Sequence, residues 1–226
     1  MSPTFADQAI RYYLNLTDPG HLPPGVSVLN PYRQPEVQTI IQTFFTRYFS
    51  DHRPRIFVLG INPGRFGAGV TGISFTTPQA LINHCGIDNN LPPTPELSSR
   101  FIYRVVDAFG GPAAFYSQFF LTSLYPLALM KSGKNYNFYD DRGLTAALWP
   151  YITDTVKQQT AFGYDRRVAV CLGRKNEGYL QRLNGQQGFF DRIVTLDHPR
   201  YILQYRSREA DAYVDQYIRT LADCLL

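Results

Sequence analysis

Cysteine is scarce in this chain of 226 residues, and the three that occur, Cys85, Cys171 and Cys224, lie far apart. Because no CxxC pair is present, the sequence does not support a structural zinc site. Three thiols are also too few for a four-cysteine iron–sulfur cluster. We therefore expect reduced, buried thiols, with no metal and no other cofactor.

Long apolar runs are absent as well. No stretch reaches 18 consecutive apolar residues, and the segment from Met1 to Asp18 does not combine a basic start with an apolar run. The sequence therefore predicts neither a membrane span nor a secretory signal peptide. We expect a cytoplasmic protein.

Charge and composition narrow the class without naming a partner. Charged residues make up 18% of the chain and hydrophobic residues 44%, which is typical of a folded protein. The net charge of +4 permits a polyanionic partner but does not require one. The length suits one sizeable domain, so we expect a single domain over residues 1–226. Residues 19–35 are rich in proline and glycine, which predicts an extended N-terminal arm over residues 1–35.

Short apolar runs predict four buried strands. They are Ile56–Leu59, Phe119–Leu121, Val168–Leu172 and Ile193–Leu196. Apolar residues at helical spacing predict helices from Val37 to Tyr48, Phe101 to Phe109, Leu144 to Ile152 and Val214 to Leu225, with Pro150 expected to break or kink the third. This alternation predicts an α/β fold, a three-layer α/β/α sandwich around a central four-stranded, mostly parallel sheet.

The segments that follow the predicted strands carry the chemistry. Ligands of parallel sheets bind at the carboxyl ends of the strands, and Asn62 lies there in the glycine-rich segment from Gly60 to Gly72. That segment has neither a GK[ST] triplet nor a GxGxxG pattern, so it does not indicate nucleotide binding by those routes. His198 follows the fourth strand, which makes it a candidate catalytic residue. Arg174 and Lys175 follow the third strand, where basic side chains can bind phosphates.

Two motifs resemble those of a known family. The segment GINPGRFGAGVTGISFT, from Gly60 to Thr76, resembles the first motif of the uracil-DNA glycosylase superfamily, and most closely that of the single-strand-selective monofunctional uracil-DNA glycosylases. His198-Pro199-Arg200 resembles the start of the second motif, which is His-Pro-Ser in that family. The resemblance implies a DNA repair enzyme of a divergent bacterial branch. It would flip a deaminated base out of DNA and hydrolyse the base–sugar bond as a monomer near the nucleoid.

The resemblance also implies roles for individual residues. Asn62 would orient the attacking water, and His198 would bind the uracil O2 and stabilise the leaving base anion. The base-binding residues would be Gly60, Ile61, Pro63, Gly64, Phe66, Gly67, Phe75, which stacks on the base, and Ser123. The DNA-binding residues would be Arg65, Arg174, Lys175, Pro199, Arg200, Tyr201 and Arg206.

One departure from the family bears on substrate choice. Ser123 aligns with the asparagine that reads the base in the family. A serine makes fewer directed hydrogen bonds than an asparagine, so we expect a broader substrate range that includes xanthine or hypoxanthine. A non-catalytic lesion-binding module and a hydrolase of free nucleosides are the alternatives. Asn62 and His198 argue against the first, and the basic residues argue against the second.

Overall fold

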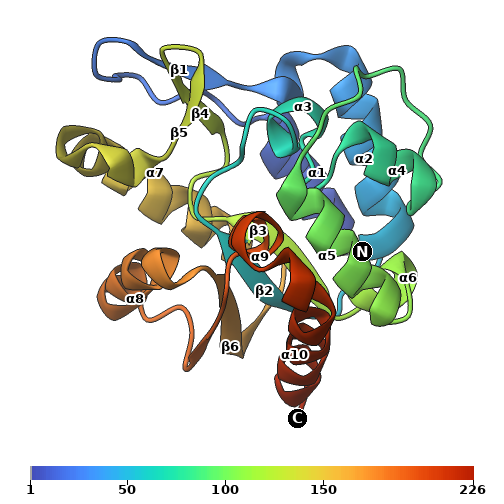
Figure 1. Ribbon diagram of the computed structural model, residues 1–226. Helices are drawn as coiled ribbons and strands as arrows, with labels where there is room; N and C mark the ends of the chain where they lie inside the picture. Colours follow the sequence, from blue (N-terminus) through green and yellow to red (C-terminus); the bar gives the residue numbers. More distant parts are fainter. Residues whose placement is uncertain (1) are drawn as a thin grey trace.

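The central element of the fold is a parallel sheet of four strands (Figure 1). The computed structural model describes residues 2–226. The strands run in the order β3-β2-β6-β7, and each neighbouring pair is parallel. Their bounds are β2 (Arg55–Gly60), β3 (Phe119–Ser123), β6 (Tyr164–Leu172) and β7 (Ile193–Leu196). The predicted α/β class and all four predicted strands are confirmed.

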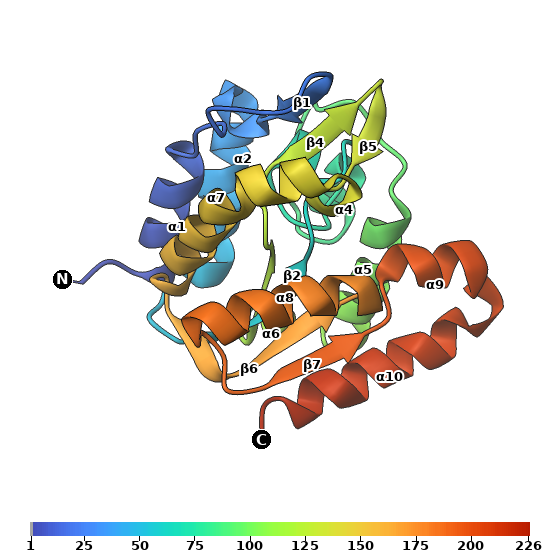
Figure 2. The same cartoon turned by 90° about the vertical axis from the view of Figure 1, so that its left-hand side faces the viewer.

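Helices cover both faces of this sheet (Figures 1 and 2). Successive side chains of a strand point to opposite faces. Accordingly, Phe119 packs on Phe109 and Phe115 on one face, while Phe120 packs on Phe5 and Phe162 on the other. The helices are α1 (Phe5–Leu14), α2 (Pro35–Phe49), α3 (Ala68–Thr71), α4 (Pro78–Asn83), α5 (Leu97–Ala108), α6 (Pro112–Tyr116), α7 (Arg142–Thr160), α8 (Arg174–Gln187), α9 (Pro199–Tyr205) and α10 (Ala210–Asp223), with short 3-10 helices η1 (Pro31–Arg33), η2 (Phe138–Asp140) and η3 (Ser207–Glu209).

The N-terminal segment corrects one expectation. The prediction of an extended arm over residues 1–35 is wrong, because residues 5–14 form helix α1. Thr4 and Asp7 make a capping box at its start. Its apolar face is buried against α2, with Phe5 stacked on Phe49 and Tyr13 stacked on Phe45. Burial of these rings stabilises a helix that would be marginal by itself.

A second, antiparallel sheet was not expected from the sequence. It contains β1 (Val26–Leu29), β4 (Ala128–Lys131) and β5 (Lys134–Tyr136) in that order. Ser132 and Gly133 both have positive φ angles, 51° and 71°, and connect β4 to β5 as a two-residue hairpin turn. The N-terminal segment thus contributes a paired strand as well as a helix.

Helix α7 departs from expectation at one point. It continues through Pro150 without a break, although proline lacks the N–H that a helix interior uses. Its buried face, formed by Leu144, Leu148 and Ile152, extends on both sides of the proline and holds both halves of the helix against the core. Within residues 2–226, no helix has both the length and the apolar character that crossing a membrane requires.

Candidate active site

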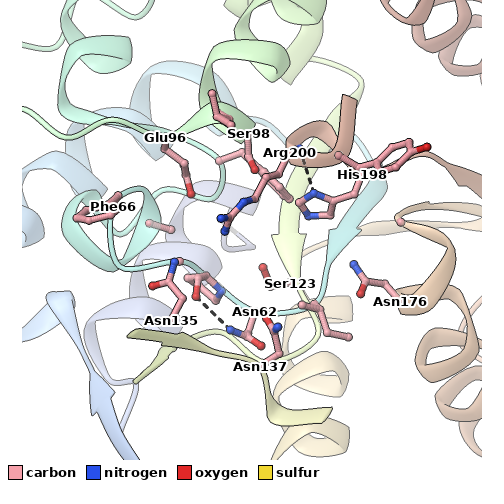
Figure 3. A pocket seen from close by; sticks show the side chains of 18 of the residues that line it. Asn62, Phe66, Glu96, Ser98, Ser123, Asn135, Asn137, Asn176, His198 and Arg200 are labelled. Carbon is pink, nitrogen blue, oxygen red and sulfur yellow. Dashed lines mark hydrogen bonds between the residues drawn. The ribbon is translucent and has the colours of Figure 1, made fainter. Parts of the chain in front are cut away.

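A cavity of about 1030 Å³ opens at the carboxyl ends of the parallel strands (Figure 3). The loops after β2, β6 and β7 and the last residue of β3, Ser123, all contribute to its wall, as the strand-end rule predicts. Thirteen sequence-predicted residues line it, namely Ile61, Asn62, Pro63, Gly64, Arg65, Phe66, Phe75, Ser123, Arg174, Lys175, His198, Arg200 and Tyr201.

Four other predicted residues do not line the cavity. Gly60 lies behind the ring of Phe75, and Gly67 lies against Glu96. Pro199 is buried in the first turn of α9. Arg206 follows α9 on the surface, where its Nη2 lies 3.2 Å from Oε2 of Glu209.

Asn62 is held rigidly by backbone groups. Its Nδ2 donates to the carbonyl oxygens of Pro63 (3.1 Å) and Tyr136 (3.2 Å). Its Oδ1 accepts the N–H of Phe138 at 3.3 Å. Two of these partners belong to β5 and η2, so the antiparallel sheet orients the side chain. A carbonyl oxygen has two lone pairs, which leaves Oδ1 able to accept one hydrogen bond from a water.

His198 has a defined tautomer. Its Nδ1 accepts the backbone N–H of Arg200 at 3.1 Å and so caps α9. Because Nδ1 is an acceptor, the proton of the neutral imidazole lies on Nε2. Burial lowers the pKa of His198 to about 4, and the charge of Arg200 adds to the shift. At neutral pH the side chain is therefore an uncharged donor that can stabilise an anion.

Phe75 provides an aromatic face beside His198. The two ring centroids are 6.2 Å apart. The φ angle of Phe75 is 57°, a strained conformation for a residue other than glycine. A Cβ at Gly60 would lie 2.8 Å from Cζ of Phe75, so the ring needs a glycine at the end of β2. The glycine and the strained backbone together place the ring at the cavity.

Ser123 ends strand β3 at the cavity wall between Asn62 and His198 (Figure 3). The residue is 5% exposed. Its hydroxyl has no hydrogen-bond partner among the side chains and backbone of residues 2–226. The group is therefore available to a ligand.

The comparisons with known proteins agree with this geometry. The uracil DNA glycosylase superfamily model matches residues 46–222. The crystal structure of wild-type Pedobacter heparinus SMUG2 is 39% identical in sequence, with a TM-score of 0.94 over 98% of each chain. The chain belongs to the uracil DNA glycosylase superfamily. No curated protein gives a significant match.

Superfamily membership confirms the resemblance found in the two motifs, and the SMUG2 structure supports the narrower one. Together, the family match and the SMUG2 structure identify the protein as a DNA glycosylase of base excision repair, with DNA as its substrate. The roles of the individual site residues stay predictions, although thirteen of these residues line one cavity.

The glycosylase has further cavity residues that the sequence reasoning missed. Asn135 accepts the backbone N–H of Arg65 at 2.9 Å and ties the hairpin to the first motif. Asn176 donates to the carbonyl oxygen of Leu172 at 2.6 Å, at the end of β6. The position of Asn176 directly after Gly173-Arg174-Lys175 was a usable signal, whereas nothing near Asn135 marked it. The missed residues also include Glu96, Asn137 and Tyr139.

The rim of the glycosylase cavity is basic and aromatic. Lys175 Nζ lies 3.8 Å from the ring centroid of Tyr139, which stacks on Tyr179. On the other side, Tyr201 and Tyr205 of α9 are exposed, with ring centroids 5.6 Å apart. Aromatic faces and cations around one opening suit the bases and phosphates of a DNA strand.

Proposed function

We propose that this glycosylase excises uracil, together with hypoxanthine or xanthine, from DNA by hydrolysis of the base–sugar bond. The observation that carries the proposal is the convergence of Asn62, Phe75 and His198 on one cavity at the strand ends. A base inside a duplex cannot reach such a cavity, so the enzyme flips it out or acts on a single strand. Phe75 then stacks on the flipped base.

The chemistry follows from the charges that develop in the transition state. The departing base gains negative charge, which the Nε2–H of neutral His198 stabilises. Asn62 is too weak a base to deprotonate water fully, so it orients the water through Oδ1 while the bond breaks. Lys134 and Lys175 line the cavity, but this scheme requires no amine nucleophile. We therefore propose a monofunctional enzyme.

The deciding experiment is a single-turnover assay on oligonucleotides that carry uracil, hypoxanthine, xanthine or thymine. We expect release of the deaminated bases and an intact strand until the abasic site is cleaved by alkali. Borohydride should trap no covalent adduct. Failure to release any of these bases would contradict the proposed function.

Ser123 carries the prediction on base choice. An asparagine amide offers a donor and an acceptor together, whereas the Ser123 hydroxyl satisfies only one partner of uracil well. We expect Ser123→Asn to raise the preference for uracil over hypoxanthine and xanthine by roughly 1–3 kcal/mol, since a wrong base then leaves a buried polar group unpaired. Single-turnover rates with each base measure it. Ser123→Ala, which adds no amide, serves as control, and an equal change in both variants would remove the amide from the explanation.

The basic rim carries a prediction on salt. Each phosphate contact releases counterions, so loss of one contact lowers the log–log salt slope of binding by about 1. We expect this decrease for Arg200→Ala and for Arg206→Ala on abasic DNA, measured by fluorescence anisotropy between low and moderate salt. Arg166→Ala is the control variant. Arg166 lies near the amino end of β6, on the opposite edge of the sheet, and its Nε is 3.1 Å from Oδ1 of Asp191. A slope that is unchanged in both rim variants would place these residues outside the DNA footprint.

A further inference from the structure

Glu96 is an acidic side chain in the cavity that the proposed chemistry does not use. It lies just before helix α5 and lines the cavity opposite His198 (Figure 3). Its Oε2 is buried without any hydrogen-bond partner. A buried carboxyl oxygen without a partner is uncommon and calls for an explanation.

Ordinary structural roles do not account for this side chain. Glu96 occupies the N-cap of α5 but makes no side-chain cap. None of the ion pairs within residues 2–226 joins its carboxyl group to a cationic side chain. Instead its carboxyl group lies over Gly67 and Gly64 of the first motif, where a Cβ at Gly67 would collide with it. The first motif thus leaves room for a carboxyl group in the cavity wall.

The surroundings of Glu96 favour its uncharged form. Burial raises its pKa to about 7, and the charge of Arg200 offsets part of the rise. The other charged or titratable groups that line the cavity are Arg65, Lys134, Tyr139, Arg174, Lys175, Asp197, His198, Tyr201 and Tyr205. Arg100 lies on α5, the helix that Glu96 precedes. In the neutral acid, Oε2 is an uncharged carbonyl oxygen, which costs much less to bury without a partner than a carboxylate oxygen does. The hydroxyl then lies on Oε1, which is not among the fully buried atoms and can donate towards the cavity.

We propose that Glu96 is a specificity-determining residue that donates a hydrogen bond from its carboxyl group to the carbonyl that deamination creates on the base. That carbonyl is O4 of uracil or O6 of hypoxanthine. Cytosine and adenine carry an amino group at the same position, so the hydroxyl of Glu96 would face another hydrogen-bond donor. Glu96 thereby contributes to the selection of uracil over cytosine and of hypoxanthine over adenine. The inference rests on the proposed function.

The test couples a change in the enzyme to a change in the base. Uracil is compared with 2-pyrimidinone, which lacks O4, and hypoxanthine with unsubstituted purine, which lacks O6. The strength of the base–sugar bond differs between the two bases of each pair. This difference cancels when the ratio of their two rates is compared between enzyme variants. We expect the carbonyl preference of the wild type at pH 6 to exceed that of Glu96→Ala by about three- to tenfold, the range of one net hydrogen bond.

Two further variants keep the test decisive. The side chain in Glu96→Gln has the same length and keeps an N–H donor at every pH, so this variant should retain the carbonyl preference. Gly67→Ala displaces the carboxyl group and should lose the preference in the wild-type background, but change nothing further when combined with Glu96→Ala. Asp215→Asn, an exposed loss of one negative charge on α10, is the matched control.

The pH profile provides a readout that a purely structural role would not move. Ionisation removes the donor, so the carbonyl preference of the wild type should fall towards that of Glu96→Ala between pH 6 and pH 8.5. Glu96→Gln should keep its preference at both values. Equal rate ratios in the wild type and Glu96→Ala would overturn the inference. So would a loss of the carbonyl preference in Arg200→Gln as large as that in Glu96→Ala. Absence of base release by the wild type would instead overturn the proposed function.

Discussion

Asn62→Ala lowers the single-turnover rate of uracil release by about 10²–10⁴, the range for a positioned group that handles a proton, while affinity for abasic DNA is retained. The physical reason is the loss of Oδ1, whose remaining lone pair orients the attacking water in the proposed mechanism. The backbone partners at Pro63, Tyr136 and Phe138 keep this oxygen in one place in the wild type. Rapid-quench assays at saturating enzyme measure the rate, and anisotropy measures the affinity.

The same substitution also removes hydrogen bonds that hold the hairpin, so its effect on stability needs a control. Each lost bond accounts for about 1 kcal/mol of net stability. Asn30 is a suitable match, since it too makes three hydrogen bonds, to Leu16, Asp18 and Tyr32, and lies outside the cavity. We expect Asn30→Ala to lower the melting temperature by a similar amount with little change in rate. If both variants lost the same rate, Asn62 would act through folding alone.

The dependence of Asn62 on the hairpin shows where sequence reasoning reached its limit. Apolar runs marked the strands, and the strand-end rule placed Asn62, Ser123 and His198 at one edge. The partner of Asn62 at Tyr136, however, is 74 residues away in the sequence, and only tertiary structure reveals it. Proline and glycine in residues 19–35 drew attention away from β1, which has only four residues, and α1 before it has only ten.

Glu96 was missed for a different reason. An acidic residue before a helix is ordinarily an exposed group near the positive end of the helix dipole. Its unusual state comes from burial against Gly64 and Gly67, and burial depends on the packing of distant segments. A sequence pattern identifies which residues follow a strand, but it does not identify which ionisable side chain is buried away from solvent.

The second large effect is expected at His198, where two roles must be separated. Its Nδ1 caps α9, and its Nε2–H would donate to the base in the proposed mechanism. Loss of one preorganised donor to a developing anion typically lowers the rate by about 10²–10³, and loss of an N-cap lowers stability by about 1 kcal/mol. His198→Ala removes both. His198→Asn retains a good N-cap residue but is too short to place a donor where Nε2 lies.

We therefore expect both variants to lose about 10²–10³ in single-turnover rate, while only His198→Ala loses stability in urea denaturation. Recovery of the rate in His198→Asn would show that the histidine acts only as a cap. The pH dependence of stability gives a second check. The unfolded chain binds a proton on this imidazole near pH 6.5, whereas the folded protein resists until about pH 4. Acid within that window consequently favours unfolding through His198, whereas Glu96, whose pKa burial raises to about 7, contributes in the opposite sense. The stability of the wild type relative to that of His198→Asn should therefore fall as the pH falls. His198→Asn lacks the His198 contribution, because asparagine does not titrate.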